Sequence, residues 1–93
     1  MEDHIKVISD YLRSQPVKKA YLFGSYARGV QDEASDIDLM IELDEQVGLY
    51  QFVGIQLKLE ELLKKNVDLI TVEGVSPRLK PYIEKDKLLV YER

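Results

Sequence analysis

Between residues 35 and 43, every second residue of the chain is aliphatic. This spacing predicts a β-strand that buries one face in a core and leaves the other face outside it. The predicted buried face carries Ile37, Leu39, Ile41 and Leu43. The opposite face carries Asp36, Asp38, Met40 and Glu42. Asp36 and Asp38 therefore point the same way, with their Cα atoms about 6.5 to 7 Å apart.

Similar patterns along the chain predict four strands, each preceded by a helix. The helices are expected over residues 2–14, 25–30, 49–65 and 77–85, and the strands over residues 17–23, 35–43, 66–72 and 88–91, the last at a sheet edge. Pro81 should bend or shorten the last helix, because proline removes one intrahelical hydrogen bond. Strands and helices joined by short connections predict an α/β (α+β) fold, with a small mixed sheet flanked by helices.

A glycine and a serine end the first strand. Gly24 allows a sharp turn and a close approach of the backbone to a ligand, and Ser25 is a good N-cap for the helix that follows. Such a turn directs N–H groups and a hydroxyl at one point, which suits a phosphate. The alternative is a turn that only connects a strand to a helix.

Charged residues near this turn suggest a metal-assisted site. Asp36 and Asp38 repel each other and any triphosphate, and Mg²⁺ between them would resolve the conflict; the alternative is a solvated strand face. Asp68 lies near the start of the third strand, where it is either partly buried and in need of a cation or proton source, or simply solvated. Arg28 either reaches triphosphate oxygens or pairs on the surface with Asp32 or Glu33.

Size and charge exclude several classes of protein. The 93 residues, 45% of them hydrophobic, suffice for one compact domain over residues 1–93. A domain of this size has room for a nucleotide site and little else. If the chain transfers a group from a nucleotide, the surface that binds the acceptor of that group should therefore come from another subunit. The net charge of −4 argues against binding to duplex nucleic acid. Without cysteine there is no disulfide framework and no thiolate zinc site. No apolar run approaches a membrane span and residues 1–4 lack the basic start of a signal peptide, so we expect a cytoplasmic protein without a membrane contact.

The spacing of these residues resembles a known signature. Gly24-Ser25, ten further residues and Asp36-Ile37-Asp38 are similar to the G-S-x10-D-x-D motif of the nucleotidyltransferase superfamily related to DNA polymerase β. Asp68 stands where the third acid of that family is expected. The short chain further resembles the minimal nucleotidyltransferases (MNT proteins), many of which act as antitoxins to HEPN-domain toxins. The resemblance implies a polymerase β-like palm in which Asp36, Asp38 and Asp68 meet on adjacent strands.

These observations lead to one main hypothesis about activity. We expect a Mg²⁺-dependent nucleotidyltransferase that moves a nucleoside monophosphate, AMP from ATP in the first place, to an acceptor hydroxyl. Asp36, Asp38 and Asp68 are the predicted catalytic and metal-binding residues, and Gly24, Ser25 and Arg28 the predicted nucleotide-binding residues. The resemblance implies that the acceptor is a tyrosine of a HEPN toxin, which the transfer would silence.

Two rival hypotheses remain open at this point. The chain could neutralise its partner by occlusion alone, as a binding module with a vestigial acidic site. It could also modify a small molecule, although a second domain for such an acceptor is missing. Tyr50, Val53 and Leu57 lie off the main apolar stripe of the longest helix, and an exposed patch formed by them would suit a protein partner. The nucleobase, the number of metals and the oligomeric state are left open by the sequence.

Overall fold

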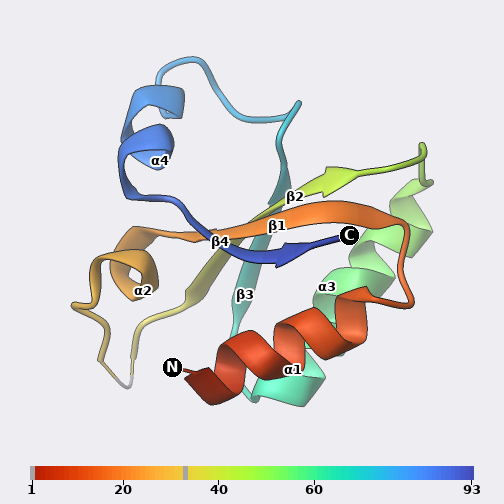
Figure 1. Cartoon of the computed structure of the whole chain (residues 1–93), viewed down its shortest axis with the longest axis horizontal. Helices are drawn as coiled ribbons and strands as arrows, with labels where there is room; N and C mark the ends of the chain where they lie inside the picture. Colours follow the sequence, from red (N-terminus) through yellow and green to blue (C-terminus); the bar gives the residue numbers. More distant parts are fainter. Residues whose placement is uncertain (1, 33) are drawn as a thin grey trace.

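The computed structural model describes residues 2–32 and 34–93, and its elements alternate between helix and strand as the sequence predicts. The order is α1 (Glu2–Leu12), β1 (Val17–Phe23), α2 (Gly24–Arg28), β2 (Ile37–Leu43), α3 (Leu49–Leu63), β3 (Val67–Thr71), α4 (Lys80–Asp86) and β4 (Leu88–Glu92). Figure 1 shows the strands in the middle of the molecule, with α1 and α3 together on one side.

The four strands form one mixed sheet in the order β3-β2-β1-β4. β1 runs antiparallel to both β2 and β4, whereas β2 and β3 run parallel. The parallel pair needs a crossover, which α3 supplies between the two strands. β3 and β4 are the edge strands, which confirms the edge position predicted for the last strand.

The core lies between one face of the sheet and the helices α1 and α3. Alternate residues of the central strands are fully buried there, as the period of two requires. The core includes Ile8 and Leu12 of α1, Ala20 and Leu22 of β1, Ile37, Leu39 and Ile41 of β2, and Ile55 and Leu59 of α3. The predicted buried face of the 35–43 segment is therefore confirmed at Ile37, Leu39 and Ile41, whereas Leu43 is only partly buried and Met40, predicted on the outer face, is buried as well. Asp38 lies on the face opposite the core, which we call the acidic face.

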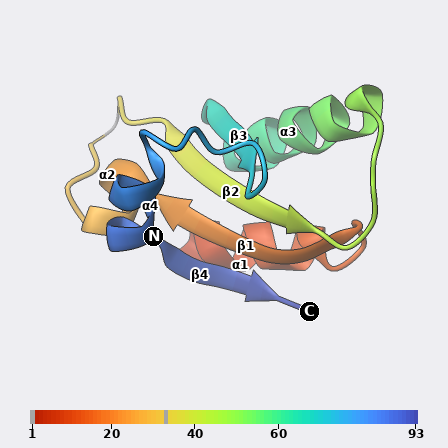
Figure 2. The ribbon, with the colours of Figure 1, turned by 90° about the horizontal axis from the view of Figure 1, so that it is seen from above.

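α2 and α4 lie together at one end of the sheet (Figures 1 and 2). They contact each other, and α2 also packs against β1 and β2. The buried side chain of Ile83 is the main apolar anchor of α4. Two segments that are more than fifty residues apart in the sequence, 24–28 and 80–86, thus meet beside the acidic face.

Most differences from the sequence prediction concern the ends of elements. The second helix begins at Gly24 and stops at Arg28, because Gly29 adopts the left-handed conformation with φ 73°. The third helix stops at Leu63, because Lys64 takes the same conformation with φ 56°. The strand predicted over residues 35–43 begins only at Ile37.

The prediction for the last helix was wrong in one respect. A turn occupies residues 76–79, and α4 begins only at Lys80. Pro81 therefore lies in the first turn of the helix, where its missing N–H would have had no partner in any case, so it removes no intrahelical hydrogen bond. Pro77 belongs to the preceding turn, which the Ser76 hydroxyl stabilises by accepting the Arg78 N–H at 3.3 Å.

The outer surface of α3 agrees in part with the prediction. Tyr50, Val53 and Leu57 are all exposed, the tyrosine side chain almost completely. Leu62, near the end of the same helix, is 40% exposed. Within residues 2–32 and 34–93, none of the helices combines the length and the apolar composition that crossing a membrane requires.

Candidate active site

Gly24 is in direct contact with the carboxylate of Asp38. The glycine follows Phe23, whose register partner across the β1–β2 ladder is Asp38. A Cβ atom at position 24 would collide with Asp38 Oδ2, and the φ angle of 72° is one that glycine adopts without strain. The sequence predicts a close approach to a ligand at this glycine, and the group beside it in the structure is a carboxylate of the same chain.

Ser25 does not act as an N-cap. Because Gly24 makes the turn itself, Phe23 takes the N-cap position without a side-chain hydrogen bond, and Ser25 lies inside the helix. The helix has only five residues, so its dipole contributes little at this point. What the turn offers an anion is the Ser25 hydroxyl together with the first N–H groups of α2, which have no partner within a helix.

Asp38 and Asp68 are direct neighbours across two strands. They are register partners in the parallel β2–β3 ladder, so both side chains leave the sheet on the acidic face. Val67 and Leu69, which flank Asp68, are buried on the core face. The structure therefore places the second and third predicted acids side by side on adjacent strands.

The three acids differ in their exposure. Asp38 is partly buried, whereas Asp36 and Asp68 are exposed. Of the two alternatives left open for Asp68, a partly buried and a solvated side chain, the solvated one therefore holds. Its strand is at the sheet edge, and whether a helix covers that part of the acidic face is a property of the tertiary structure that local sequence does not specify.

The electrostatic environment of Asp38 joins the three acids into one cluster. Burial raises the pKa of Asp38, and the negative charges of Asp68 and Asp36 raise it further. The positive charge of Arg28 opposes them and lowers it. The positive charge of Arg28 thus does not offset the negative charges of the two neighbouring acids at Asp38. A cation bound there would relieve the repulsion among the three carboxylates.

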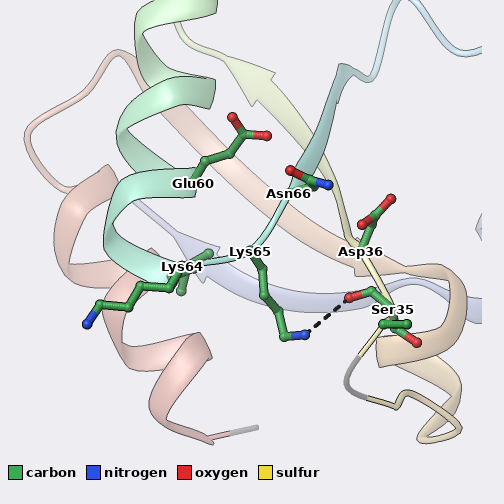
Figure 3. Close-up of a pocket in the computed structure, with 8 residues that line it drawn as sticks. Ser35, Asp36, Glu60, Lys64, Lys65 and Asn66 are labelled. Carbon is green, nitrogen blue, oxygen red and sulfur yellow. Dashed lines mark hydrogen bonds between the residues drawn. The ribbon is translucent and has the colours of Figure 1, made fainter.

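An open cleft of about 550 Å³ begins at Asp36 and runs to the end of α3. Ser35 and Asp36 form one side of it, and Lys65 and Asn66 lie opposite (Figure 3). The Lys65 ammonium extends toward Ser35 and donates a hydrogen bond to its carbonyl at 3.4 Å, whereas Lys64 points away. The cleft gives Asp36 an approach from solvent that is lined by polar groups.

Mg²⁺ is the ion that the acidic motif implies. Within residues 2–32 and 34–93, no three histidine, aspartate or glutamate side chains stand close enough to enclose a metal ion as they lie. The donor set nevertheless fits the ion, because Mg²⁺ prefers carboxylate oxygens and binds through one or two of them while keeping several waters. Asp36 and Asp68 are exposed, and such side chains change rotamer within nanoseconds. We therefore regard Asp36, Asp38 and Asp68 as fit to hold Mg²⁺.

Arg28 pairs with a residue that the sequence did not suggest. Its Nη1 donates to Asp86 Oδ2 at 3.0 Å, and Asp86 lies at the end of α4, 58 residues away. The alternative surface pairing with Asp32 is not present, and Asp32 accepts the Ala34 N–H. The other predicted partner, Glu33, lies outside the described residues.

Two further side chains fix the start of β3. Glu60 Oε2 accepts the Val67 N–H and Gln56 Nε2 donates to the Val67 carbonyl, both at 2.9 Å. Together they act on the outer edge of β3 as a neighbouring strand would, because they satisfy both backbone groups of one residue. This pair, which we call the α3 clamp, sets the position of the residue before Asp68, and no sequence pattern indicated it.

Comparison with known proteins agrees with this geometry. Residues 6–93 match the family model described as polymerase beta, nucleotidyltransferase. A candidate protein adenylyltransferase of Methanocaldococcus jannaschii is 40% identical over 93 residues, which cover 97% of this chain and 90% of the relative. One chain of a crystal structure of a toxin–antitoxin with AMP-PNP superposes with a TM-score of 0.83 at 25% identity, covering 96% of this chain and 73% of that one.

A second solved structure shows the same fold at lower identity. It contains a tri-AMPylated HEPN toxin of Shewanella oneidensis in complex with an MNT antitoxin, and it matches with a TM-score of 0.77 at 21% identity. The match covers 99% of this chain and 72% of the other chain. With the family model matching almost the whole sequence, the chain belongs to the polymerase beta nucleotidyltransferase family and is a nucleotidyltransferase.

Proposed function

We propose that the chain transfers AMP from ATP, with Mg²⁺, to a hydroxyl group of a partner protein, and that it acts in this way as an antitoxin. The observation that carries the proposal is the cluster of Asp38, Asp68 and Asp36 beside the Gly24 turn. The name of the Methanocaldococcus relative supports protein as the acceptor class, and the AMP-PNP complex supports a nucleoside triphosphate as the donor.

Each residue of the cluster has a distinct part in the proposal. Gly24 and Ser25 hold the β- and γ-phosphates with N–H groups and the hydroxyl. Asp36 and Asp38 are the main ligands of Mg²⁺, with Asp68 as a further ligand. Bound Mg²⁺ would offset the charge of the triphosphate and polarise the α-phosphorus. Arg28, half-exposed and near enough to affect the pKa of Asp38, adds positive charge on the same side.

The transfer forms one bond and breaks one. The acceptor oxygen bonds to the α-phosphorus while the bond from that phosphorus to the β-bridging oxygen breaks, and pyrophosphate leaves with the electron pair. The proton of the acceptor hydroxyl passes to a carboxylate, for which exposed Asp68 is accessible from solvent. Most of the catalysis in such reactions is positioning and charge stabilisation, so each ligand of the cluster should matter greatly.

The acceptor in this proposal is a tyrosine of a HEPN-domain toxin encoded with the chain. The resemblance to MNT antitoxins suggests the partner, and the toxin–antitoxin assembly at 25% identity supports a protein complex. The acidic face also fits this arrangement, because Asp36 and Asp68 are exposed and accessible to an acceptor on another chain.

The test is transfer of labelled AMP from ATP to the partner in the presence of Mg²⁺. Asp38→Asn should lower the rate by several orders of magnitude, because it removes a charge that holds the metal and the leaving group. Glu42→Gln is the matched control, since Glu42 lies on the same face of the same strand and should tolerate the change within about threefold. Equal and negligible labelling by wild type and Asp38→Asn, with both proteins folded, would contradict the enzymatic proposal.

A further inference from the structure

Asp86 and Arg28 join two helices beside the proposed phosphate site. Arg28 is the last residue of α2 and Asp86 the last residue of α4, and the two helices lie together at one end of the sheet (Figure 1). Arg28 Nη1 donates to Asp86 Oδ2 at 3.0 Å. The Arg28 side chain is 50% exposed, whereas that of Asp86 is only 22% exposed. The acid of the pair is thus the more enclosed group, and the arginine is the one that solvent and ligands can reach.

The position of Asp86 in its helix is an unfavourable one for an acid. The last carbonyl groups of a helix carry partial negative charge, which repels a carboxylate at that end. The neighbouring lysine is engaged elsewhere, because Lys87 Nζ binds Glu84 Oε2 at 2.9 Å and lies 4.7 Å from the centre of the Tyr21 ring. The contact with Arg28 therefore accounts for an acid at this position.

The backbone around Asp86 is well fixed. Ile83, one turn earlier, is buried and anchors α4. The Lys87 N–H donates to the Ile83 carbonyl at 2.8 Å and closes the last turn of the helix. Arg28, in contrast, extends a long side chain from a helix that ends directly after it, at Gly29. Asp86 is thus the rigid member of the pair and Arg28 the member that it can hold in place.

We propose that Asp86 is a positioning residue for nucleotide binding, which holds the Arg28 guanidinium toward the triphosphate; this inference rests on the proposed function. The bond to Asp86 uses one of the five N–H donors of a guanidinium, and the planar group can bind a phosphate through others at the same time. Arg28 lies near enough to lower the pKa of Asp38, so its charge already acts on the acidic cluster. A long side chain that is held before the ligand arrives loses less conformational entropy on binding.

The sign of the effect separates positioning from charge. Asp86 is negative, so charge alone predicts that its removal strengthens the binding of any polyphosphate. Loss of positioning has the opposite effect, because the ligand must then order the Arg28 side chain itself. At about 0.15 M salt the charge effect is screened, and we expect the loss of positioning to prevail.

Calorimetric titration of the full chain measures this effect. The ligands are ATP and inorganic tripolyphosphate, each with Mg²⁺. Asp86→Ala should weaken the binding of both by about three- to tenfold, the cost of ordering one long side chain. Asp86→Asn keeps an acceptor oxygen for Arg28 and should lose less, which also provides a milder variant if the alanine protein is poorly folded. The matched control is Glu84→Ala, which removes an acid of the same helix that pairs with Lys87 and should change both affinities less than about twofold.

A double-mutant cycle assigns the effect to Arg28. Arg28→Ala should weaken both ligands, and in that background Asp86→Ala should add less than about twofold, because the side chain on which it acts is gone. Equal losses with and without Arg28 would overturn the proposal. Binding by Asp86→Ala as tight as that of wild type, or tighter, would overturn it as well. Wild type that binds neither ligand would refute the proposed function itself, and this inference with it.

Discussion

At the scale of single residues, the candidate site depends on a contact that only glycine allows. Gly24 has a positive φ, and a Cβ atom there would meet Asp38 Oδ2. Gly54, in the middle of α3, has no positive φ, and a Cβ atom at that position would have no neighbouring atom within 4 Å. The chain therefore contains one glycine required by the site and one that serves as a control for it.

Alanine at these two positions should have opposite effects on the free energy of unfolding. Gly24→Ala should lower it by about 1–3 kcal/mol, because the Cβ forces Asp38 aside and the backbone conformation disfavours alanine. Gly54→Ala should raise it by about 0.5–1 kcal/mol, since alanine is the better helix former. Urea unfolding measures both. A Gly24→Ala protein as stable as wild type would show that the contact is not as described.

The charge cluster should cost stability when no metal is bound. Burial and the neighbouring acids raise the pKa of Asp38 in the folded protein, so its ionised form destabilises the fold at neutral pH. The penalty is complete above the raised pKa, declines as the pH falls through it, and vanishes below the ordinary pKa of aspartate, about 3.9. In EDTA at pH 7, Asp38→Asn should therefore raise Tm by ~2–4 °C, a fraction of a kcal/mol in a domain of this size.

The same measurement has an internal check. The difference in Tm between Asp38→Asn and wild type should shrink as the pH is lowered toward 4. Mg²⁺ with ATP should raise the Tm of wild type but not that of Asp38→Asn. Glu42→Gln serves as the control on the same strand face. If Asp38→Asn were less stable than wild type at pH 7 in EDTA, the acids would not repel one another as proposed.

At the scale of elements, the position of β3 depends on α3. The α3 clamp, Gln56 and Glu60, satisfies the outward N–H and carbonyl of Val67, and the next residue is Asp68. Because β3 is an edge strand, no other strand fixes this side of it. The helix thereby sets where the third acid stands relative to Asp38.

Breaking the clamp should move Asp68 as well as weaken the fold. Glu60→Leu should lower the free energy of unfolding by about 1–2 kcal/mol and speed hydrogen exchange at the Val67 amide. Glu60→Gln still offers an acceptor, so it should retain most of the stability and most of the protection of this amide from exchange. Glu60→Leu should also weaken Mn²⁺ binding under conditions in which the variant and wild type are folded to the same extent. A residue that only stabilised the fold would leave the Mn²⁺ affinity unchanged under those conditions. Glu61→Leu, next along the helix and paired with Lys58 on the surface, is the control. Wild-type exchange at Val67 in Glu60→Leu would contradict the role of the clamp.

Element types were predictable from sequence because each has a strong local period, as in residues 35–43. The errors arose where local rules compete. Pro77 and Pro81 are both suitable for the first turn of a helix, and the choice between them depends on tertiary packing, in which Ile83 is buried and α4 contacts α2. The motif also indicated Asp36, Asp38 and Asp68. It did not indicate Asp86, which contacts a residue 58 positions away, or the α3 clamp, whose two side chains contact a residue 11 and 7 positions away. No local sequence pattern specifies such contacts.

At the scale of the whole molecule, the two faces of the sheet differ in what covers them. α1 and α3 cover one face and form the core (Figure 2). On the acidic face, Asp36 and Asp68 are exposed to solvent. In the proposed function, the nucleotide site is thus built within the chain, and the acceptor approaches from outside.

This arrangement predicts that the chain binds the nucleotide by itself but needs the partner for the transfer step. The isolated chain should bind Mg²⁺ and ATP, but release of pyrophosphate should rise at least ~100-fold when the partner is added, because a positioned acceptor replaces bulk water. Pyrophosphate release followed with and without partner measures this. Equal rates under both conditions would favour an acceptor within the chain itself.

The central claim is that three acids beside the Gly24 turn hold a divalent metal and a triphosphate together. A crystal structure with AMP-PNP and Mn²⁺, in which the anomalous signal locates the metal, tests it most directly. We predict a Mn²⁺ ion within about 2.3 Å of carboxylate oxygens of Asp36 and Asp38, with the phosphates at Gly24 and Ser25. A metal and nucleotide bound elsewhere, with these carboxylates contacting neither, would contradict the account.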